Sequence, residues 1–187
     1  LPANDAPVLS SIDAATTEED TAFVMTLSST DVDGDDVTYS ASVSSGSVTV
    51  DESILTLLPE QDFNGDITVA VIVSDGDLSD NESFTLTVTA VNDPPEYNVD
   101  APFSNLTFDE DSELQSIDLS QHFSDIDSEI SYSVEENLDF VITEINQNEL
   151  NILFVENLYG SGDIIIIASD GIDSDNGTFN LTVNEVN

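Results

Sequence analysis

Short phrases from the first half of the chain return in the same order in the second half, and this repetition constrains the fold more than any other feature. Self-similarity at a long, nearly fixed period indicates consecutive structural units, each with its own core. The sequence therefore predicts two domains, residues 1–91 and 92–187. The matching phrases are TTEEDTAF (16–23) and TFDEDSEL (107–114), DVDGDDVTYS (31–40) and DIDSEISYS (125–133), DITVAVIVSDG (66–76) and DIIIIASDG (163–171), and SFTLTVTAVN (83–92) and TFNLTVNEVN (178–187).

Apolar and polar residues alternate along several segments, as expected where only one face of a sheet meets a core. Shorter apolar runs at 48–50 and 55–58 indicate further strands, and no segment shows a helical period. The sequence predicts an all-β fold of two tandem Greek-key, seven-stranded β-sandwiches arranged end to end. The alternating sets are Val37, Tyr39, Ala41 and Val43; Ile67, Val69, Val71 and Val73; Phe84, Leu86, Val88 and Ala90; and Phe179, Leu181 and Val183.

The charge of the chain is extreme, because 40 Asp and Glu residues stand against no Lys or Arg and give a formal net charge of −40. A surface without cationic side chains cannot neutralise a phosphate backbone or settle on anionic lipid, so nucleic acid and direct membrane insertion are excluded as partners. Cys is absent, which removes disulfides and thiolate metal sites. Clustered carboxylates in such a chain require a counter-ion, and metal ions are the positive charges available.

Three kinds of acidic phrase recur at the predicted ends of strands: Asp-x-Asp, Glu-Asp and Ser-Asp-Gly. Ca²⁺ binds six to eight oxygen ligands from carboxylates, carbonyls and Asn side chains. Residues two apart in an extended chain point the same way, so both carboxylates of Asp-x-Asp can reach one ion. Acidic loop residues are often merely solvated, but the recurrence of these phrases in the same register favours a Ca²⁺ site.

Together with the linker phrases NDAPV and VNDPP and with PEQDFNGD (59–66), these phrases resemble tandem cadherin-like repeats of large bacterial surface or adhesion proteins. The resemblance covers nearly the whole chain, twice. It implies that Ca²⁺ binds where one repeat follows another, with ligands from the base of the first repeat, the linker and the top of the second.

Carried over residue by residue, the resemblance implies one complete junction and two half-sites. The complete junction comprises Glu19, Glu60, Asp62, Asn92, Asp93, Asp125, Asp127 and Asp170; the N-terminal half-site comprises Asp5, Asp31, Asp33 and Asp75; the C-terminal half-site comprises Glu110, Glu156, Glu185 and Asn187. Two positions depart from the family pattern. Ala90 stands where animal linkers carry an acid, and Leu158 is aligned with Asp62, so we expect between one and three ions at a junction.

Other site types find less support in the sequence. His122 is the only histidine, and without Cys it cannot build a zinc site, so we expect it at the surface or at a strand edge. Nothing singles out a carboxylate pair for glycoside hydrolysis, and no aromatic cluster indicates a sugar platform. The chain is accordingly predicted not to be an enzyme.

The favoured function is a calcium-stiffened spacer or structural repeat of an adhesin or surface fibre, and we expect it outside the cell, on the surface of a bacterium. Its partners would then be neighbouring repeats of the same chain or fibre. A recognition module that binds carbohydrate or another copy of itself is the alternative. A third hypothesis explains the acidity as adaptation to high salt, without specific metal sites.

Overall fold

A computed structural model of the chain describes residues 3–186. The chain divides into two compact units, residues 1–91 and 92–187, and we describe each unit by itself. The prediction of an all-β fold with two sandwich domains is confirmed, since the single helical element in the described part is a 3₁₀ turn at Leu119–Gln121 (η1). Within residues 3–186, no helix is long and apolar enough to span a membrane.

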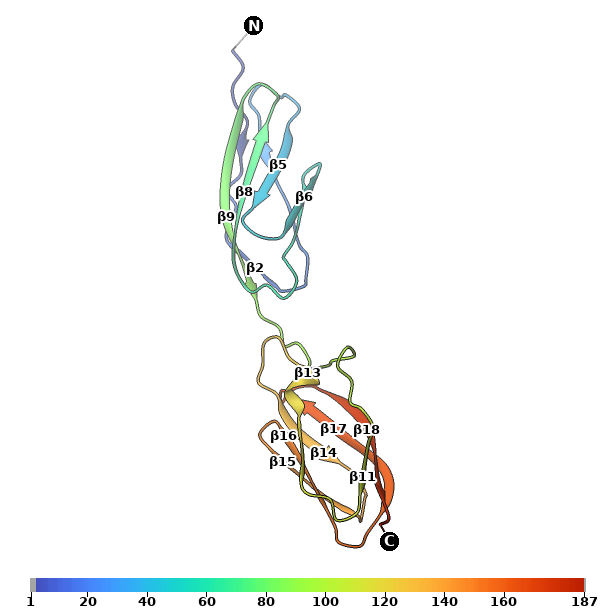
Figure 1. The fold of residues 1–187 in the computed structure, drawn as a ribbon. Helices are drawn as coiled ribbons and strands as arrows, with labels where there is room; N and C mark the ends of the chain where they lie inside the picture. The colour runs from blue at the N-terminus through green and yellow to red at the C-terminus, as the bar shows by residue number, and fades with distance from the viewer. Residues whose placement is uncertain (1–2, 187) are drawn as a thin grey trace. The chain divides into compact units, whose positions relative to one another are not determined.

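The first unit is a sandwich of two main sheets, one ordered β2-β9-β8-β5 and the other β3-β7-β6, with a short β1-β4 pair. Figure 1 shows β9, β8 and β5 side by side in this unit. Its strands are β1 (Val8–Leu9), β2 (Ala15–Glu18), β3 (Phe23–Thr26), β4 (Ser29–Thr30), β5 (Thr38–Val43), β6 (Ser47–Asp51), β7 (Ile54–Leu58), β8 (Gly65–Ser74) and β9 (Ser79–Thr89).

The second unit repeats this plan, with sheets ordered β11-β18-β17-β14 and β12-β16-β15 and a short β10-β13 pair. Each unit therefore has the same strand order, which is that of a Greek-key sandwich. The strands are β10 (Glu96–Tyr97), β11 (Leu106–Asp109), β12 (Gln115–Asp118), β13 (Phe123–Ser124), β14 (Ser131–Glu135), β15 (Val141–Asn146), β16 (Glu149–Phe154), β17 (Gly160–Ser169) and β18 (Ser174–Asn184).

The first strand of each sandwich is divided between the two sheets. In the first unit, β1 pairs antiparallel with β4, whereas β2 crosses to the other sheet and pairs in parallel with β9. The second unit does the same with β10 and β11. The second strand is divided as well, into β3 and β4 or β12 and β13, so seven predicted strands become nine shorter ones. The linker residues before β1 and β10 lie against the loops at one end of their own sandwich.

Alternating residues of the long central strands form the core of each unit. Every second residue along part of each strand is fully buried: on β8 these are Ile67, Val69, Val71 and Val73, and on β17 they are Ile164, Ile166 and Ala168. The alternation prediction is wrong at Ala90, which is exposed because β9 ends one residue earlier, at Thr89.

The two cores differ in their aromatic content. The first unit has one aromatic contact, between Phe23 and Phe84, among its described residues. In the second unit, Tyr97, Phe103, Phe123, Tyr132 and Phe179 form a continuous chain of ring contacts. His122 joins this chain: its ring is half-buried, lies 4.1 Å from the ring of Phe103 and has Nδ1 2.6 Å from the carbonyl oxygen of Ala101.

Candidate metal centres

The loop after β4 gathers three carboxylates at one end of the first unit. Oxygens of Asp31, Asp33 and Asp35 all lie within 4.8 Å of one another. Oδ1 of Asp31 accepts hydrogen bonds from the backbone N–H groups of Asp33, Gly34 and Asp35 at 2.8, 3.0 and 3.3 Å. The other oxygen of Asp31, Oδ2, is buried and has no hydrogen-bond partner in the described structure.

The equivalent loop of the second unit has the same arrangement at Asp125. Its Oδ1 accepts from the backbone N–H groups of Asp127 and Ser128 at 3.1 and 2.7 Å. Its Oδ2 is again buried and without a hydrogen-bond partner among residues 3–186. A buried carboxylate oxygen that lacks a partner is costly, and two such atoms at equivalent positions fit a ligand that the chain itself does not supply, such as a cation.

Linker asparagines bind the Ser-Asp-Gly aspartates at this same end of each unit. Nδ2 of Asn4 donates to Asp75 at 3.0 Å, and Nδ2 of Asn92 donates to Asp170 at 2.8 Å. Asn92 also donates to Asp173 at 3.2 Å. In the first unit, the backbone N–H of Asp5 donates to Asp33 at 2.7 Å. The predicted N-terminal half-site residues Asp5, Asp31, Asp33 and Asp75 therefore occupy one end of the first unit.

The carboxylates at this end fall into two electrostatic groups. The pKa of Asp75 is lowered by backbone hydrogen bonds from Leu78 and Asp77, with a further contribution from Asn4. The pKa of Asp170 is lowered in the same way, by Ile172, Asp173 and Asn92. The pKa of Asp35 is instead raised, first by desolvation and then by the negative charges of Asp31, Asp33, Asp75 and Asp36. Crowding of like charges is the condition that a bound cation relieves.

The opposite end of each unit carries a Glu-Asp pair whose glutamate accepts a hydrogen bond from the backbone that follows the last strand. Glu19 is 5% exposed and accepts from the backbone N–H of Val91 at 2.7 Å. Glu110 accepts from the backbone N–H of Val186 at 2.9 Å. These bonds fix the backbone just beyond β9 and β18, so both glutamates hold the start of the segment that leaves their unit.

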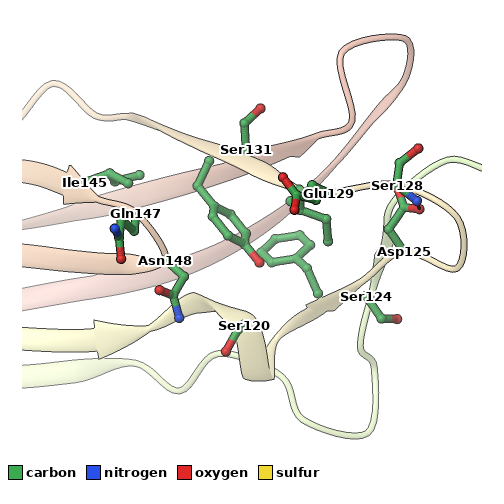
Figure 2. A pocket seen from close by; sticks show the side chains of 12 residues that line it. Ser120, Ser124, Asp125, Ser128, Glu129, Ser131, Ile145, Gln147 and Asn148 are labelled. Atoms are coloured by element: carbon green, nitrogen blue, oxygen red, sulfur yellow. Dashed lines mark hydrogen bonds between the residues drawn. The ribbon is translucent and has the colours of Figure 1, made fainter.

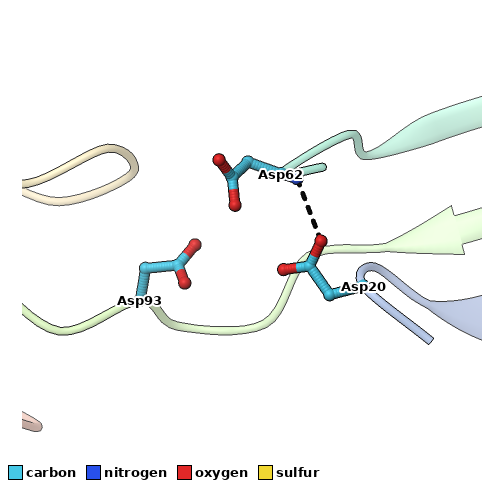
Figure 3. A group of neighbouring side chains, drawn as sticks. All are labelled: Asp20, Asp62 and Asp93. Atoms are coloured by element: carbon cyan, nitrogen blue, oxygen red, sulfur yellow. Dashed lines mark hydrogen bonds between the residues drawn. The ribbon is translucent and has the colours of Figure 1, made fainter. Parts of the chain in front are cut away.

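The aspartate of each pair binds a left-handed residue in a neighbouring loop. Asp20 accepts from the backbone N–H of Asp62 at 3.2 Å, as Figure 3 shows; the third residue drawn there, Asp93, belongs to the start of the second unit. Asp111 accepts from Asn157 at the same distance. Asp62 and Asn157 both have positive φ, 55° and 59°. The alignment of Asp62 with Leu158 is therefore wrong, because the structural equivalent of Asp62 is Asn157. The side chain of Asn157 carries an amide oxygen of the kind that Ca²⁺ binds.

The remaining predicted ligands that the structure describes have exposed side chains. Asp127 is exposed and contributes a backbone N–H to Asp125. Glu60, Glu156 and Glu185 are exposed, and Asn187 lies outside the described residues. By loop position Glu60 corresponds to Val155, since the backbone carbonyls of these two residues accept equivalent turn hydrogen bonds from Phe63 and Leu158.

Several residues of these end loops were not predicted as ligands. Asp35 joins the carboxylate group of the first unit, and Asp173 binds Asn92 in the second. Asp80 and Asp175 accept from the backbone N–H groups of Leu9 and Tyr97, at 2.9 and 2.8 Å, and so attach β1 and β10 to the sandwich. The recurring phrase Ser-Asp-Asn at 79–81 and 174–176 was the available signal for Asp80 and Asp175.

The family model for the cadherin-like domain matches residues 3–89. Residues 3–89 form a cadherin-like domain. The second unit has the same strand order and the same end-loop hydrogen bonds, so it repeats the architecture of this domain. None of the curated proteins compared with the chain matches it.

Solved cadherin structures share the fold of these repeats. Drosophila N-cadherin EC1-4 is 20% identical with a TM-score of 0.61, and the match covers 97% of this chain and 50% of that one. The extracellular cadherin domains 1–5 of protocadherin gamma B2 are 21% identical with a TM-score of 0.58, covering 96% and 39%. Human protocadherin-24 EC1-2 is 19% identical with a TM-score of 0.55, covering 97% and 100%. The cadherin-like repeats thus span about half or less of the first two.

Proposed function

We propose that these repeats are calcium-binding, non-enzymatic structural modules of an extracellular protein. The observation that carries this proposal is the buried, unpartnered Oδ2 of Asp31 and of Asp125, at the same position in both repeats. Each of these oxygens lies in a loop that holds further carboxylates, and the chain has no Lys or Arg that could compensate them. A cation bound at these oxygens would satisfy them and offset the surrounding negative charge.

The donor set favours Ca²⁺ among the biological cations. All nearby ligand atoms are oxygens, and carboxylate oxygens within 4.8 Å of one another can share an ion that binds oxygen at about 2.3–2.6 Å. Thiolate is absent from the chain. Ca²⁺ accepts six to eight oxygen ligands in variable geometry, whereas Mg²⁺ requires near-ideal octahedral coordination, so irregular loops of carboxylates suit Ca²⁺ better.

We further propose that the ions are shared where one repeat follows the next, so that calcium stiffens the array. Glu19, Glu60 and Asp62 would contribute from the first repeat, Asn92 and Asp93 from the linker, and Asp125, Asp127 and Asp170 from the second; Glu110, Glu156, Glu185 and Asn187 would contribute to a following repeat. Support comes from the recurrence of each end loop and from the hydrogen bond between Glu19 and Val91, which fixes the start of the linker. The neighbours of the chain in its fibre or stalk would then be further repeats.

Thermal unfolding in Ca²⁺ and in chelator tests the calcium sites. A site with a dissociation constant of about 10⁻⁴ M stabilises its domain by about 2.7 kcal/mol in 10 mM Ca²⁺, which raises Tm by about 10–20 °C for a domain of this size. We expect Asp31→Asn to abolish most of this shift for the first repeat and Asp125→Asn to do so for the second. Isothermal titration of Ca²⁺ into each variant gives the affinities directly.

The matched control is Asp51→Asn, which removes one negative charge from an exposed position on β6. Its Ca²⁺-dependent shift should equal that of the unmodified chain. NaCl added to the same ionic strength separates binding from screening. If NaCl raised Tm as much as CaCl₂ does, the acidity would reflect adaptation to salt, and the proposal of specific calcium sites would fail.

A further inference from the structure

An open pocket of about 980 Å³ lies in the second repeat, at the same end as Asp125. Figure 2 shows Ser120 and Asn148 along one side of it, with Asp125 and Ser128 toward one end. Serine hydroxyls and the amides of Gln147 and Asn148 share its lining with apolar side chains, of which Tyr132 is half-buried and Phe123 is buried beneath it. Groups that both donate and accept hydrogen bonds therefore lie around one partly exposed aromatic side chain.

A two-residue insertion builds this pocket in the second repeat. The backbone N–H groups of Leu27 and Leu119 make equivalent hydrogen bonds, to the carbonyls of Ser53 and Asn148. The carbonyls of Ser28 and His122 are equivalent in the same way, because they accept from Ser10 and Asn98. Ser120 and Gln121 are thus additional residues, and they form the 3₁₀ turn η1 beside the pocket.

Tyr132 in the pocket and its equivalent in the first repeat, Tyr39, have different side chains opposite their hydroxyl groups. In the first repeat, the hydroxyl of Tyr39 lies 2.8 Å from the hydroxyl of Ser29. In the second, Tyr132 occupies the position of Tyr39, and Phe123 replaces the serine. Phe123 offers no hydroxyl to Tyr132, which lines the pocket. Burial, followed by the nearby charge of Asp118, raises its pKa, so the hydroxyl stays protonated and can donate.

Two lining residues also differ from the first repeat, and one of these differences removes a charge. Gln147, with a φ of 57°, occupies the turn position of Glu52, with a φ of 51°, and Asn148 follows it where the first repeat has Ser53. The pocket thus gains neutral amides, while Asp125 and Glu129 remain in its lining as acceptors. A net charge of −40 opposes any anionic ligand.

We propose that this pocket binds a neutral oligosaccharide, whose hydroxyl groups would pair with Tyr132, Ser120, Gln147 and Asn148 while a sugar ring contacts the half-buried ring of Tyr132. Sugars present both donors and acceptors at close spacing, which matches hydroxyl, amide and carboxylate groups arranged around an aromatic surface. The site is a property of the second repeat, and it does not rest on calcium binding.

Titration of the ¹⁵N-labelled chain with neutral hexasaccharides tests the proposal, using cellohexaose, xylohexaose, mannohexaose and N-acetylchitohexaose. We expect at least one of them to shift the amide resonances of Ser120, Gln147 and Asn148. Tyr132→Phe removes only the hydroxyl and should weaken that binding about tenfold. Gln147→Glu restores the residue type of the first repeat and should weaken it as well. Shifts seen in either CaCl₂ or EDTA support the site, so its failure is distinguishable from failure of the calcium sites.

The matched control is Tyr39→Phe, the same change at the equivalent position of the first repeat, and it should leave the affinity unchanged. Equal weakening by Tyr39→Phe and Tyr132→Phe would overturn the assignment of the site. Absence of sugar-dependent shifts at the three amides for all four hexasaccharides would overturn the proposal. Binding of chitosan alone, abolished by 0.5 M NaCl, would also overturn it, because general attraction of a cation would then explain the interaction.

Discussion

At the scale of single residues, repeated aspartates serve two different purposes that the sequence does not separate. Asp31 and Asp125 keep an unpartnered buried oxygen, which fits a metal ligand. Asp80 and Asp175 instead accept backbone hydrogen bonds that attach the first strand to the sandwich. Both kinds recur in register and both follow or begin strands. Recurrence therefore identifies structurally constrained aspartates. Only the hydrogen-bond partners of each carboxylate in the folded structure distinguish a candidate metal ligand from an aspartate that stabilises the fold.

Asp118 stabilises the fold through hydrogen bonds to its carboxylate, and the pH dependence of unfolding tests this role. Its carboxylate accepts from the hydroxyl and backbone N–H of Ser120 at 2.6 and 3.0 Å, and from the side-chain amides of Gln121 and Asn148 at 3.2 and 3.0 Å. These bonds, the Ser120 hydroxyl foremost, lower its pKa from 3.8 to about 2. The folded-state pKa is depressed, so the contribution to stability is complete above about pH 4 and is lost as the pH falls toward 2.

We therefore expect Asp118→Asn to lower Tm at pH 6, with a difference from the unmodified chain that shrinks as the pH falls from about 4 to about 2. Thermal unfolding by circular dichroism over that range measures the difference. Asp139→Asn removes the same charge from an exposed position and corrects for reduced self-repulsion. A constant difference between the two variants from pH 6 to pH 2 would contradict the assigned role of Asp118.

At the scale of strands, alternation predicted β8 well because one of its faces is fully buried, whereas β17 was recognised by the likeness of DIIIIASDG to the phrase that covers β8. Every second residue from Ile67 to Val73 on β8 and from Ile164 to Ala168 on β17 has no exposed surface. The free energy of burying these side chains outweighs local conformational preferences. The division of the first strand into β1 and β2 was not predictable, since it depends on which sheet each part can reach. The aromatic chain of the second repeat also escaped prediction, because its residues are distant in sequence and meet only in the folded core.

Gly177 on β18 shows how that aromatic chain constrains a strand. A Cβ atom at this position would lie 2.5 Å from Cε2 of Tyr97 and 2.8 Å from Cε2 of Phe103. We expect Gly177→Ala to displace both rings and to reduce the free energy of unfolding of the second repeat by about 1–3 kcal/mol. Chemical denaturation measures this loss. Glu82 is the equivalent residue of β9, and Glu82→Ala should change stability by less than about 0.5 kcal/mol; comparable losses in both variants would show that the rings do not set the requirement.

At the scale of the whole molecule, a charge of −40 must be reconciled with two folded repeats. Salt screens exposed charges beyond about 8 Å at physiological ionic strength, but it does little for carboxylates a few ångströms apart. In the first repeat such crowding is concentrated in the loop that holds Asp31, Asp33 and Asp35, where like charges contribute to the raised pKa of Asp35. Divalent cations bound there remove two charges each, so the proposed calcium sites and the tolerance of extreme acidity have a common physical basis.

Small-angle scattering tests the proposed stiffening on the intact chain. If Ca²⁺ is shared between successive repeats, the linker loses freedom when the ion binds, because ligands from both repeats become attached to one centre. We expect the distance distribution in 10 mM CaCl₂ to be narrower, with a different maximum dimension, than in EDTA at equal ionic strength. Asp125→Asn should give the EDTA profile in both media, whereas Asp139→Asn should respond as the unmodified chain does. Calcium binding by calorimetry without any change in scattering would leave the sites intact as ligand centres but would refute the spacer mechanism, because an ion bound within one repeat cannot restrict the linker.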